Sequence, residues 1–187
     1  MNVSWPVRTE RLSLRPATPQ DSEATWRFQQ LESVCRWLTR APKSFGDYRA
    51  WFEDPETLSK MVVIELDGEV IGDLMLVVEN AWAQAEVADR AQGVQADLGW
   101  VLHPEYAGRG YATEAVRELL RICFEERGLR RVTAHCFAAN ESSWRLMERV
   151  GMRREMHSVR ESLHRSGEWM DSLGYALLAE EWRSTTA

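Results

Sequence analysis

A pair of glycines separated by one residue lies in the segment from His103 to Ala115, HPEYAGRGYATEA. The segment follows an apolar run, LGWVL, and leads into residues with helical spacing. A glycine loop at the start of a helix directs backbone N–H groups and the positive end of the helix dipole toward an anion, and glycine removes the Cβ atoms that would hold the anion off. The chemistry indicated is phosphate binding by the main chain. The alternative is a tight turn with incidental glycines, and the loop alone does not decide between them.

Two common phosphate-binding patterns do not fit this loop. No G-K-[ST] follows the glycines, so the loop is not a P-loop. The third glycine and the downstream acidic residue of a dinucleotide-binding fingerprint are also missing from the sequence. The loop is therefore neither of these two motifs.

Three polar residues in the same part of the chain are candidate site residues. Asp97 opens an otherwise apolar strand, where partial desolvation suits a general base, although a hydrogen-bonded strand-end carboxylate is an equal alternative. Asn140 stands where it can N-cap a helix, and that role alone would justify the residue. Ser143 shares a helix face with Leu146 and Met147, so it is harder to explain as solvated surface.

The cysteines do not indicate a disulfide, a metal site or a nucleophile. Cys35, Cys123 and Cys136 are widely spaced, with no C-x-x-C pair and no clustered histidines. Cys123 falls on the apolar face of a helix and Cys136 in a strand, so neither lies in a nucleophile motif. We therefore expect buried thiols in a reducing compartment.

Length and composition limit the classes of protein further. At 187 residues with 44% hydrophobic residues, the chain is long enough for one well-cored domain and short for two. The net charge of −6 argues against a nucleic-acid binder and favours a cationic or neutral partner. The N-terminus lacks a signal-peptide pattern, and no apolar run approaches the roughly 18 residues of a membrane helix, so we expect a cytoplasmic protein that binds no membrane. Nine tryptophans without a fixed period argue against a repeat protein and would suit a homodimer interface.

The spacing of apolar residues predicts the elements that must position these groups. Asp67-Gly68 between two β-rich runs, within residues 61–78, predicts a hairpin. Residues 34–59 are expected to form one or two short helices with loops, and residues 79–95 an irregular excursion that is partly helical. The other predicted strands are 11–17, 96–102, 131–137, 153–160 and 169–177, and the longer predicted helices are 21–31, 112–123 and 140–151. This order is typical of a mixed α/β single domain.

Several motifs occur in a fixed order along the chain. T-E-R-L-x-L-R occupies residues 9–15, AGRGYA residues 107–112, and NESSWRLMERVGM begins at Asn140. G-E-W-x-D and E-E-W follow near the C-terminus, at residues 167–171 and 180–182. Residues 96–155 resemble the acetyl-CoA-binding half of the GNAT superfamily of N-acetyltransferases, whose loop pattern is [Q/R]-x-x-G-x-[G/A]. The opening and closing motifs resemble the branch that contains the ribosomal-protein N-terminal acetyltransferases.

The resemblance implies a fold of the α/β class for the whole chain. It implies one domain over residues 1–187, with a central twisted, mixed and mostly antiparallel sheet of about six or seven strands. About four helices would flank this sheet. Acetyl-CoA would be the co-substrate, and no metal is implied.

The resemblance also assigns residues to cofactor binding. Backbone N–H groups at Leu102 and its neighbours would hold the acetyl and pantetheine parts, and the glycine loop would hold the pyrophosphate. The positions concerned are Leu102, His103, Ala107, Gly108, Arg109, Gly110, Tyr111, Ala112, Asn140 and Ser143. Ala107 departs from the family, which has Gln or Arg there, but this change removes a side chain and leaves the backbone amides. The imidazole of His103 is given no role, because a lone histidine at a strand end is more often structural.

Two catalytic roles follow from the same resemblance. Asp97 would act as general base, directly or through water, and the Ser143 hydroxyl would give a proton to the departing thiolate. Asn140 would contact the pantetheine arm, and Arg109 is the arginine best placed for a phosphate. Tyr111 is expected to pack rather than to catalyse.

The sequence leads to one expected function and two alternatives. We expect transfer of acetyl from acetyl-CoA to a primary amine by direct attack, without a covalent enzyme intermediate. The acceptor is a protein or peptide N-terminus or a small-molecule amine, bound by residues 21–59, residues 79–95 and the last two strands. A longer acyl chain is one alternative, and a non-catalytic acyl-CoA-binding or regulatory module is the other.

Overall fold

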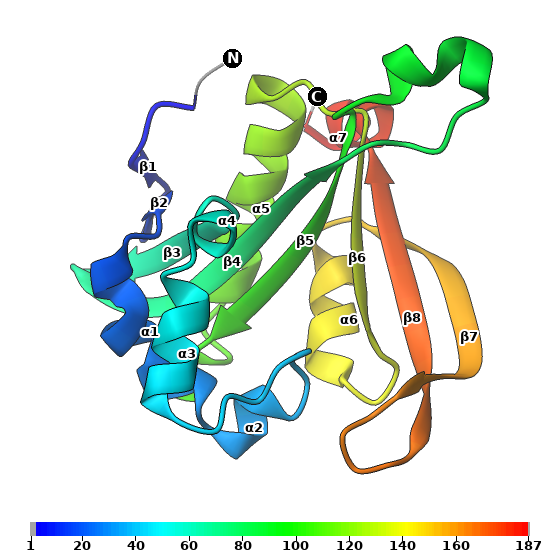
Figure 1. Ribbon diagram of the computed structural model, residues 1–187. Helices are drawn as coiled ribbons and strands as arrows, with labels where there is room; N and C mark the ends of the chain where they lie inside the picture. The colour runs from blue at the N-terminus through cyan, green and yellow to red at the C-terminus, as the bar shows by residue number, and fades with distance from the viewer. Residues whose placement is uncertain (1–2, 187) are drawn as a thin grey trace. The chain divides into compact units, whose positions relative to one another are not determined.

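The strands of the computed structural model, which describes residues 3–186, are shown in Figure 1. Within these residues, eight strands are hydrogen-bonded in the order β1-β2-β3-β4-β5-β6-β8-β7. β5 and β6 are parallel, whereas the pairs β1–β2, β2–β3, β3–β4, β6–β8 and β7–β8 are antiparallel. The predicted α/β class and the mixed, mostly antiparallel sheet are confirmed. The sheet has more strands than predicted because β1 (Val7–Arg8) is two residues long, too short for an alternating pattern to reveal.

Contacts within the chain divide it into two compact units, and each is described by itself. The first unit contains Ser4–Met75 and Trp100–Val116. The second unit contains Leu76–Gly99 and residues 117–186.

The strands of the first unit form an antiparallel meander. β2 (Ser13–Pro16) pairs with β3 (Met61–Leu66), and β3 pairs with β4 (Glu69–Glu79). Asp67 and Gly68 join β3 to β4 with φ angles of 52° and 86°. Two consecutive residues with positive φ make a type I′ turn, whose twist matches that of the strands. The hairpin predicted from Asp67-Gly68 is therefore confirmed.

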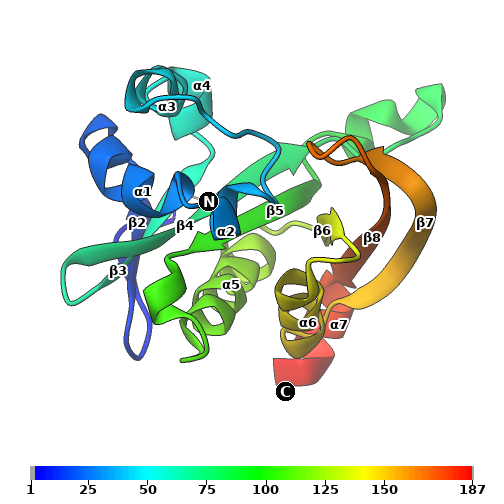
Figure 2. The ribbon, with the colours of Figure 1, turned by 90° about the horizontal axis from the view of Figure 1, so that it is seen from below.

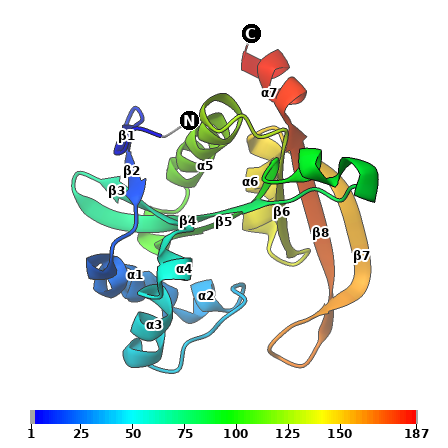
Figure 3. The same ribbon diagram turned by 45° about the horizontal axis from the view of Figure 1, so that its top comes forward.

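Short helices cover one face of this meander. Ser44 Oγ accepts the backbone N–H of Asp47 at 3.1 Å and so caps one helix, while Asp54 Oδ2 caps the next by accepting the N–H of Thr57 at 3.0 Å. Figure 3 shows α1, α3 and α4 on the same side of β3 and β4. Residues 34–59 contain two complete short helices, α3 and α4, as predicted, together with the end of α2. The helices of the first unit are α1 (Ser22–Gln29), α2 (Glu32–Cys35), α3 (Phe45–Phe52) and α4 (Pro55–Leu58).

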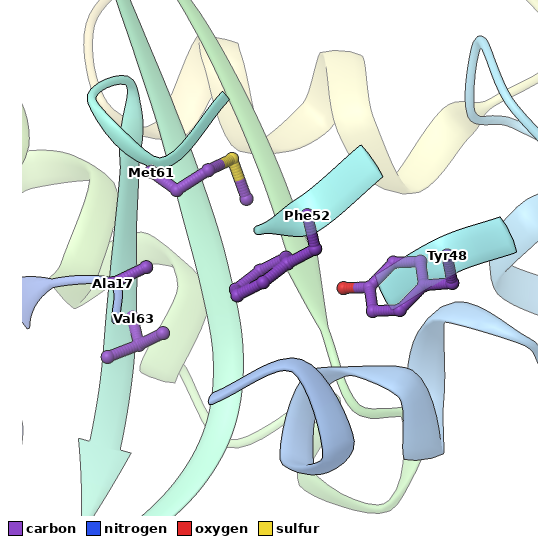
Figure 4. Packing of buried hydrophobic residues seen from close by; sticks show 5 residues of the cluster. All are labelled: Ala17, Tyr48, Phe52, Met61 and Val63. Carbon is purple, nitrogen blue, oxygen red and sulfur yellow. The ribbon is translucent and has the colours of Figure 1, made fainter. Parts of the chain in front are cut away.

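An apolar cluster joins these helices to the strands (Figure 4). Tyr48 and Phe52 extend from α3 and are almost fully buried. They pack against Ala17 and against Met61 and Val63 of β3. Burial of side chains of this size contributes about 1.5–3 kcal/mol each to the stability of the fold.

A carboxyl group lies in the same packed layer. Asp73, opposite Val63 in the β3–β4 register, is 3% exposed. Its Oδ2 accepts a hydrogen bond of 2.8 Å from Gln29 Nε2 of α1. Burial disfavours the charged form and raises the pKa of Asp73 to about 7, although the bond from Gln29 opposes the rise.

The second unit is built on a long antiparallel hairpin. β7 (Arg153–Leu163) pairs with β8 (Trp169–Leu178), and β8 pairs along its length with β6 (Arg131–Phe137). Figure 2 shows β7 and β8 curving together beside α6 (Glu141–Arg149). The predicted strands are confirmed here, but α7 (Ala179–Thr186) was not predicted because its short polar sequence carries no apolar stripe.

Other parts of the chain agree with the predicted pattern. The excursion at residues 79–95 contains a 3₁₀ segment, Ala85–Ala91, as the partly helical prediction requires. β5 (Gln95–Leu102) and α5 (Tyr111–Arg121) begin in one unit and end in the other. Through the part of the chain that the structure describes, no helix has the length and apolar character needed to cross a membrane.

We predict that Asp73 makes the stability of the protein fall as the pH rises. Its folded pKa, about 7, lies above the ordinary value of 3.8, so the folded chain holds this proton more tightly than the unfolded chain does. The contribution is complete below about pH 4 and is lost as the pH approaches 7. Asp73→Asn mimics the neutral carboxyl group and should raise the free energy of unfolding at pH 8 by at least about 1 kcal/mol, with little change at pH 4.

Urea denaturation of the Asp73→Asn variant and the wild type between pH 4 and pH 8 checks this expectation. Asp67→Asn, an exposed change at a turn position that asparagine tolerates, is the matched control and should leave the pH dependence unaltered. If the free energy of unfolding changed with pH in the same way for Asp73→Asn and wild type, the prediction would be contradicted.

Candidate active site

The glycine loop lies in the first unit between a short 3₁₀ turn and α5. The turn, Pro104–Tyr106, closes with the Ala107 N–H bonding the Pro104 carbonyl at 3.0 Å. Gly108 and Gly110 then adopt φ angles of 76° and 83°, which favour glycine. A Cβ atom added at Gly108 would meet no heavy atom within 4 Å, so backbone conformation rather than crowding requires this glycine.

The first turn of α5 follows the loop directly. Its first internal bond runs from the Glu114 N–H to the Gly110 carbonyl, 3.0 Å long. The amides of Tyr111 and Ala112 precede it and head the helix, where backbone N–H groups lack carbonyl partners four residues back. With the helix dipole, these amides are suited to hold a phosphate oxygen.

An arginine from the N-terminal motif holds this loop in place. Arg11 Nε donates to Glu114 Oε2 at 2.7 Å, and Arg11 Nη1 donates to the carbonyl of Arg109 at 3.0 Å. The same guanidinium lies 4.5 Å from the centre of the Tyr111 ring. Thr9 adds a bond of 2.6 Å from its hydroxyl to Glu114 Oε1. The T-E-R-L segment therefore fixes both the loop and the start of α5.

Glu114 is the shared acceptor in this arrangement. Burial by itself raises the pKa of Glu114, but the hydrogen bonds from Thr9 and Arg11 outweigh burial and hold the pKa below its usual range. Sequence reasoning placed Thr9 and Arg11 in a family motif without giving them a role, and it did not single out Glu114. The only available signal was the motif itself, because Arg11 and Glu114 are 103 residues apart.

His103, which precedes the loop, makes hydrogen bonds and ring contacts that hold the turn before the loop. The His103 N–H donates to the Ile71 carbonyl at 2.8 Å, and His103 Nδ1 accepts the N–H of Glu105 at 3.2 Å. The imidazole packs edge-on against Phe28 and so serves as a turn cap, consistent with the absence of an assigned role. At Gly72, a Cβ atom would lie 2.5 Å from the Val101 carbonyl oxygen, so this glycine permits the close approach of β4 to the end of β5.

In the second unit, the pairing of β5 with β6 covers only the start of β5. The register consists of Gln95↔Arg131, Ala96↔Val132 and Asp97↔Thr133. On its other side, β6 is paired with β8 along its whole length, up to Phe137. Asp97 therefore stands at the last paired position of the two parallel strands.

Asp97 has two neighbours on β6. Thr133 Oγ1 donates to Asp97 Oδ1 at 3.0 Å, and His135 Nδ1 lies 3.2 Å from the same oxygen. The hydrogen bond to Asp97 raises the pKa of His135 above its usual value, against the effect of burial. His135 was not predicted, although the alternation of the strand places Thr133 and His135 on one face and could have indicated it.

Asn140 and Ser143 lie at the start of α6. Asn140 occupies the N-cap position, but its side chain makes no capping bond and instead accepts the Ser142 hydroxyl at 2.9 Å. The Ser143 hydroxyl hydrogen-bonds the thiol of Cys136 on β6. The purely structural N-cap interpretation of the Asn140 side chain is therefore wrong in this structure.

Cys123 is buried, whereas Cys35 and Cys136 are half-buried, so the expectation of buried thiols is confirmed for Cys123 alone. Burial raises the pKa of Cys123 to about 12 and that of Cys136 to about 11, so both thiols stay protonated near neutral pH.

The structure groups the predicted site residues in two sets. Residues 102–112 form the loop region of the first unit, while Asp97, Asn140 and Ser143 belong to the second, each with its own partners.

Comparison with known proteins agrees with this geometry. A family model described as an acetyltransferase (GNAT) domain matches residues 11–153. The uncharacterized N-acetyltransferase YnaD of Bacillus subtilis is 41% identical over 182 residues, covering 94% of this chain and 98% of YnaD. YdaF of the same organism, provisionally named a ribosomal N-acetyltransferase, is 29% identical over 92% of this chain and 94% of its own.

A solved structure extends the likeness to the fold. Mycobacterium smegmatis RimJ in complex with CoA-disulfide has a TM-score of 0.75 and 26% identity, covering 95% of this chain and 90% of that chain. The family model spans the T-E-R-L arginine, the glycine loop and the start of α6. The chain therefore belongs to the GNAT family of N-acetyltransferases.

Proposed function

We propose that the protein transfers acetyl from acetyl-CoA to a primary amine by direct attack. The observation that carries the proposal is the glycine loop at the start of α5, with Gly108 and Gly110 at positive φ, in a chain of this family. The CoA-disulfide bound to the related RimJ supports CoA as the carrier of the acyl group.

The residues of the first unit fit a CoA pyrophosphate. Main-chain amides at Gly108, Gly110 and the head of α5 would bind it, and no side chain at Ala107 contributes. Arg109 supplies a cation in the same loop, with its guanidinium 5.9 Å from the Tyr106 ring centre. Leu102 and His103 are proposed to line the acetyl and pantetheine portions through their backbone.

The residues of the second unit supply acid–base groups. Acetyl-CoA provides a thioester, whose carbonyl is open to attack by a neutral amine. Asp97 is proposed to take part in removing a proton from the amine, and Ser143 to return one to the sulfur. Asn140, whose side chain does not cap α6, is proposed to contact the pantetheine arm. The raised pKa values of Cys123 and Cys136 favour direct attack over an acyl-cysteine intermediate.

The acceptor is proposed to be a cationic amine, either a peptide N-terminus or a small molecule. The net charge of −6 favours such a partner, and the name of the relative YdaF is consistent with a protein acceptor. An open recess of about 850 Å³ on the β7–β8 hairpin, lined by Arg160, Glu168, Trp169 and Met170, is a candidate acceptor surface. A cytoplasmic location and a homodimer stay predictions.

Thiol release from acetyl-CoA tests the proposal. With the purified protein, we expect thiol release only when an amine is added, measured against a panel of N-terminal peptides, polyamines and aminoglycosides. The acetylated amine should appear by mass spectrometry in equal amount. CoA binding without turnover for any amine would favour the non-catalytic module, and a longer acyl-CoA used faster than acetyl-CoA would favour the other alternative.

We predict that Gly110→Val abolishes acetyl-CoA binding while the protein stays folded. Valine at a φ of 83° is strained by roughly 1–3 kcal/mol, and its side chain would stand on the loop that presents the amides. Gly68→Val, at a φ of 86° in the β3–β4 turn, carries the same strain away from the loop. Calorimetric titration should show binding only for the Gly68 variant; equal loss in both, or retained affinity at Gly110→Val, would contradict the role of the loop.

We also predict that Arg11→Ala weakens acetyl-CoA binding without lowering kcat. Loss of the bonds to Glu114 and Arg109 frees the loop, so that ordering it on binding should raise the Kd about tenfold. The kcat at saturating acetyl-CoA should stay near that of wild type. Lys60→Ala, which breaks a surface ion pair with Glu56, is the control and should change neither value. An unchanged Kd for Arg11→Ala would sink the prediction.

A further inference from the structure

His135 and Asp97 form a pair of side chains within the second unit. His135 extends from β6 and Asp97 from β5, and Nδ1 of the ring lies 3.2 Å from Oδ1 of the carboxylate. We infer that the Nε2 atom of His135 receives the proton of the acceptor amine and that Asp97 is a positioning residue that orients the ring. This inference rests on the proposed acetyl transfer and names the atom that carries out its proton step.

The hydrogen-bond pattern selects the form of the histidine. Asp97 Oδ1 is already an acceptor, because the Thr133 hydroxyl donates to it at 3.0 Å. A carboxylate oxygen can only accept, so His135 Nδ1 must carry the hydrogen that lies between them. In the neutral ring, Nε2 then has a free lone pair and can take a proton. This arrangement of carboxylate, Nδ1–H and basic Nε2 is the one in which a carboxylate fixes the tautomer of a histidine base.

Exposure also favours the histidine over the carboxylate. The His135 side chain is 55% exposed, whereas that of Asp97 is 29% exposed. Across the β6–β8 register, His135 faces Gly174. A Cβ atom at Gly174 would lie 3.1 Å from Cδ2 and 3.3 Å from Nε2 of His135 and 3.2 Å from Met156 Cβ, so glycine at this position makes room for the imidazole ring.

Charged groups from four strands surround the ring, and together they raise the pKa of His135 above its usual value. Asp97 on β5 has the largest effect and raises the pKa of His135; Glu79 on β4 also raises it, and Arg131 on β6 lowers it. Glu161 on β7 interacts with the ring as well, and it accepts the Ser172 hydroxyl of β8 at 2.7 Å. A base whose pKa lies near the working pH is the most effective in proton transfer.

A second histidine–aspartate pair in the same unit shows what a structural pair looks like. His157 Nε2 lies 2.8 Å from Asp171 Oδ2, and Asp171 Oδ1 accepts the backbone N–H of Arg160 at 2.9 Å. There the carboxylate fixes the backbone of the β7–β8 hairpin, and the histidine uses Nε2 for the bond. His135 differs because Nδ1 makes the bond to the carboxylate, which leaves Nε2 out of that bond.

The proton balance of the step is as follows. An ammonium N–H proton passes to His135 Nε2, and the freed lone pair forms the C–N bond to the acetyl carbon. The C–S bond breaks, and its electron pair leaves with the sulfur. The second nitrogen proton reaches the sulfur, with Ser143 as the proposed carrier, and His135 releases its proton to water. The products are the amide, the thiol and one proton.

The test compares His135→Asn with Asp97→Ala. Asparagine can keep an N–H donor near the position of Nδ1 and thus the bond to Asp97, but it has no atom at Nε2. We expect His135→Asn to lower kcat about 100-fold or more and to remove the acid limb of the kcat/KM pH profile. Asp97→Ala should keep that limb and move it to lower pH, since the group that raises the pKa of His135 is gone. Loss of the limb in Asp97→Ala together with its survival in His135→Asn would make Asp97 the base and overturn the inference.

Two further measurements separate this result from misfolding and from failure of the proposed reaction. Asp67→Asn, an exposed change in the β3–β4 turn, is the control and should leave kcat, the pH profile and acetyl-CoA affinity unchanged. Acetyl-CoA affinity should also be unchanged in His135→Asn. Nitrogen-15 NMR of the free protein reports the tautomer without any substrate. Nδ1–H with a titrating Nε2 supports the inference even for an inactive wild type, whereas a hydrogen on Nε2 at neutral ring charge would overturn it.

Discussion

The carboxylate of Glu114 is the acceptor on which the geometry of the glycine loop depends. It receives the hydroxyl of Thr9, the backbone N–H of Arg11 and the guanidinium of Arg11, and that guanidinium continues to the carbonyl of Arg109. Charge-assisted bonds of this kind are stronger and more directional than neutral ones. The amides of the loop are thereby oriented on folding, so a ligand that binds them does not also have to order them.

The contact between Asp97 and His135 in the second unit depends on a different constraint, the short register between two parallel strands. Asp97 is the last residue of β5 that pairs with β6, and its partner there is Thr133. His135 lies two residues after Thr133 on β6. Side chains two apart on a strand point to the same face, so the ring reaches back to the carboxylate. A single strand, β5, thus carries Asp97 near its start and Leu102, next to the loop, at its end.

Local patterns predicted most of the elements because their causes are local. Asp67-Gly68 requires a turn whose residues tolerate positive φ, and the alternation of residues 131–137 predicted β6 with its correct bounds. The glycine loop was also recognised from a local pattern, the Gly-x-Gly at Gly108 and Gly110, and both residues have positive φ. Asn140 shows the limit of this reasoning, because its position at the helix start was correct but its side chain bonds Ser142.

Contacts between residues that are distant in the sequence could not be predicted from local patterns. The role of Arg11 depends on a carboxylate 103 residues away, and that of His135 on a neighbouring strand 38 residues away. Asp73 lies in a run of apolar strand residues, and nothing local says that α1 and α3 would close over it. Two-residue β1 and the polar helix α7 are held by contacts rather than by any pattern of their own.

The distance between Arg11 and the loop also limits how the protein can be divided. Residues 96–155 contain the glycines, α5 and the start of α6, and by sequence they look like a self-sufficient binding half. Their loop is nevertheless tied down by Thr9 and Arg11, which lie outside that stretch. A fragment cut at residue 96 would keep every residue of the loop motif and lose the anchor that shapes it. A truncation that removes Thr9 and Arg11 therefore alters the glycine loop, even though the two ends of that interaction are more than half of the chain apart.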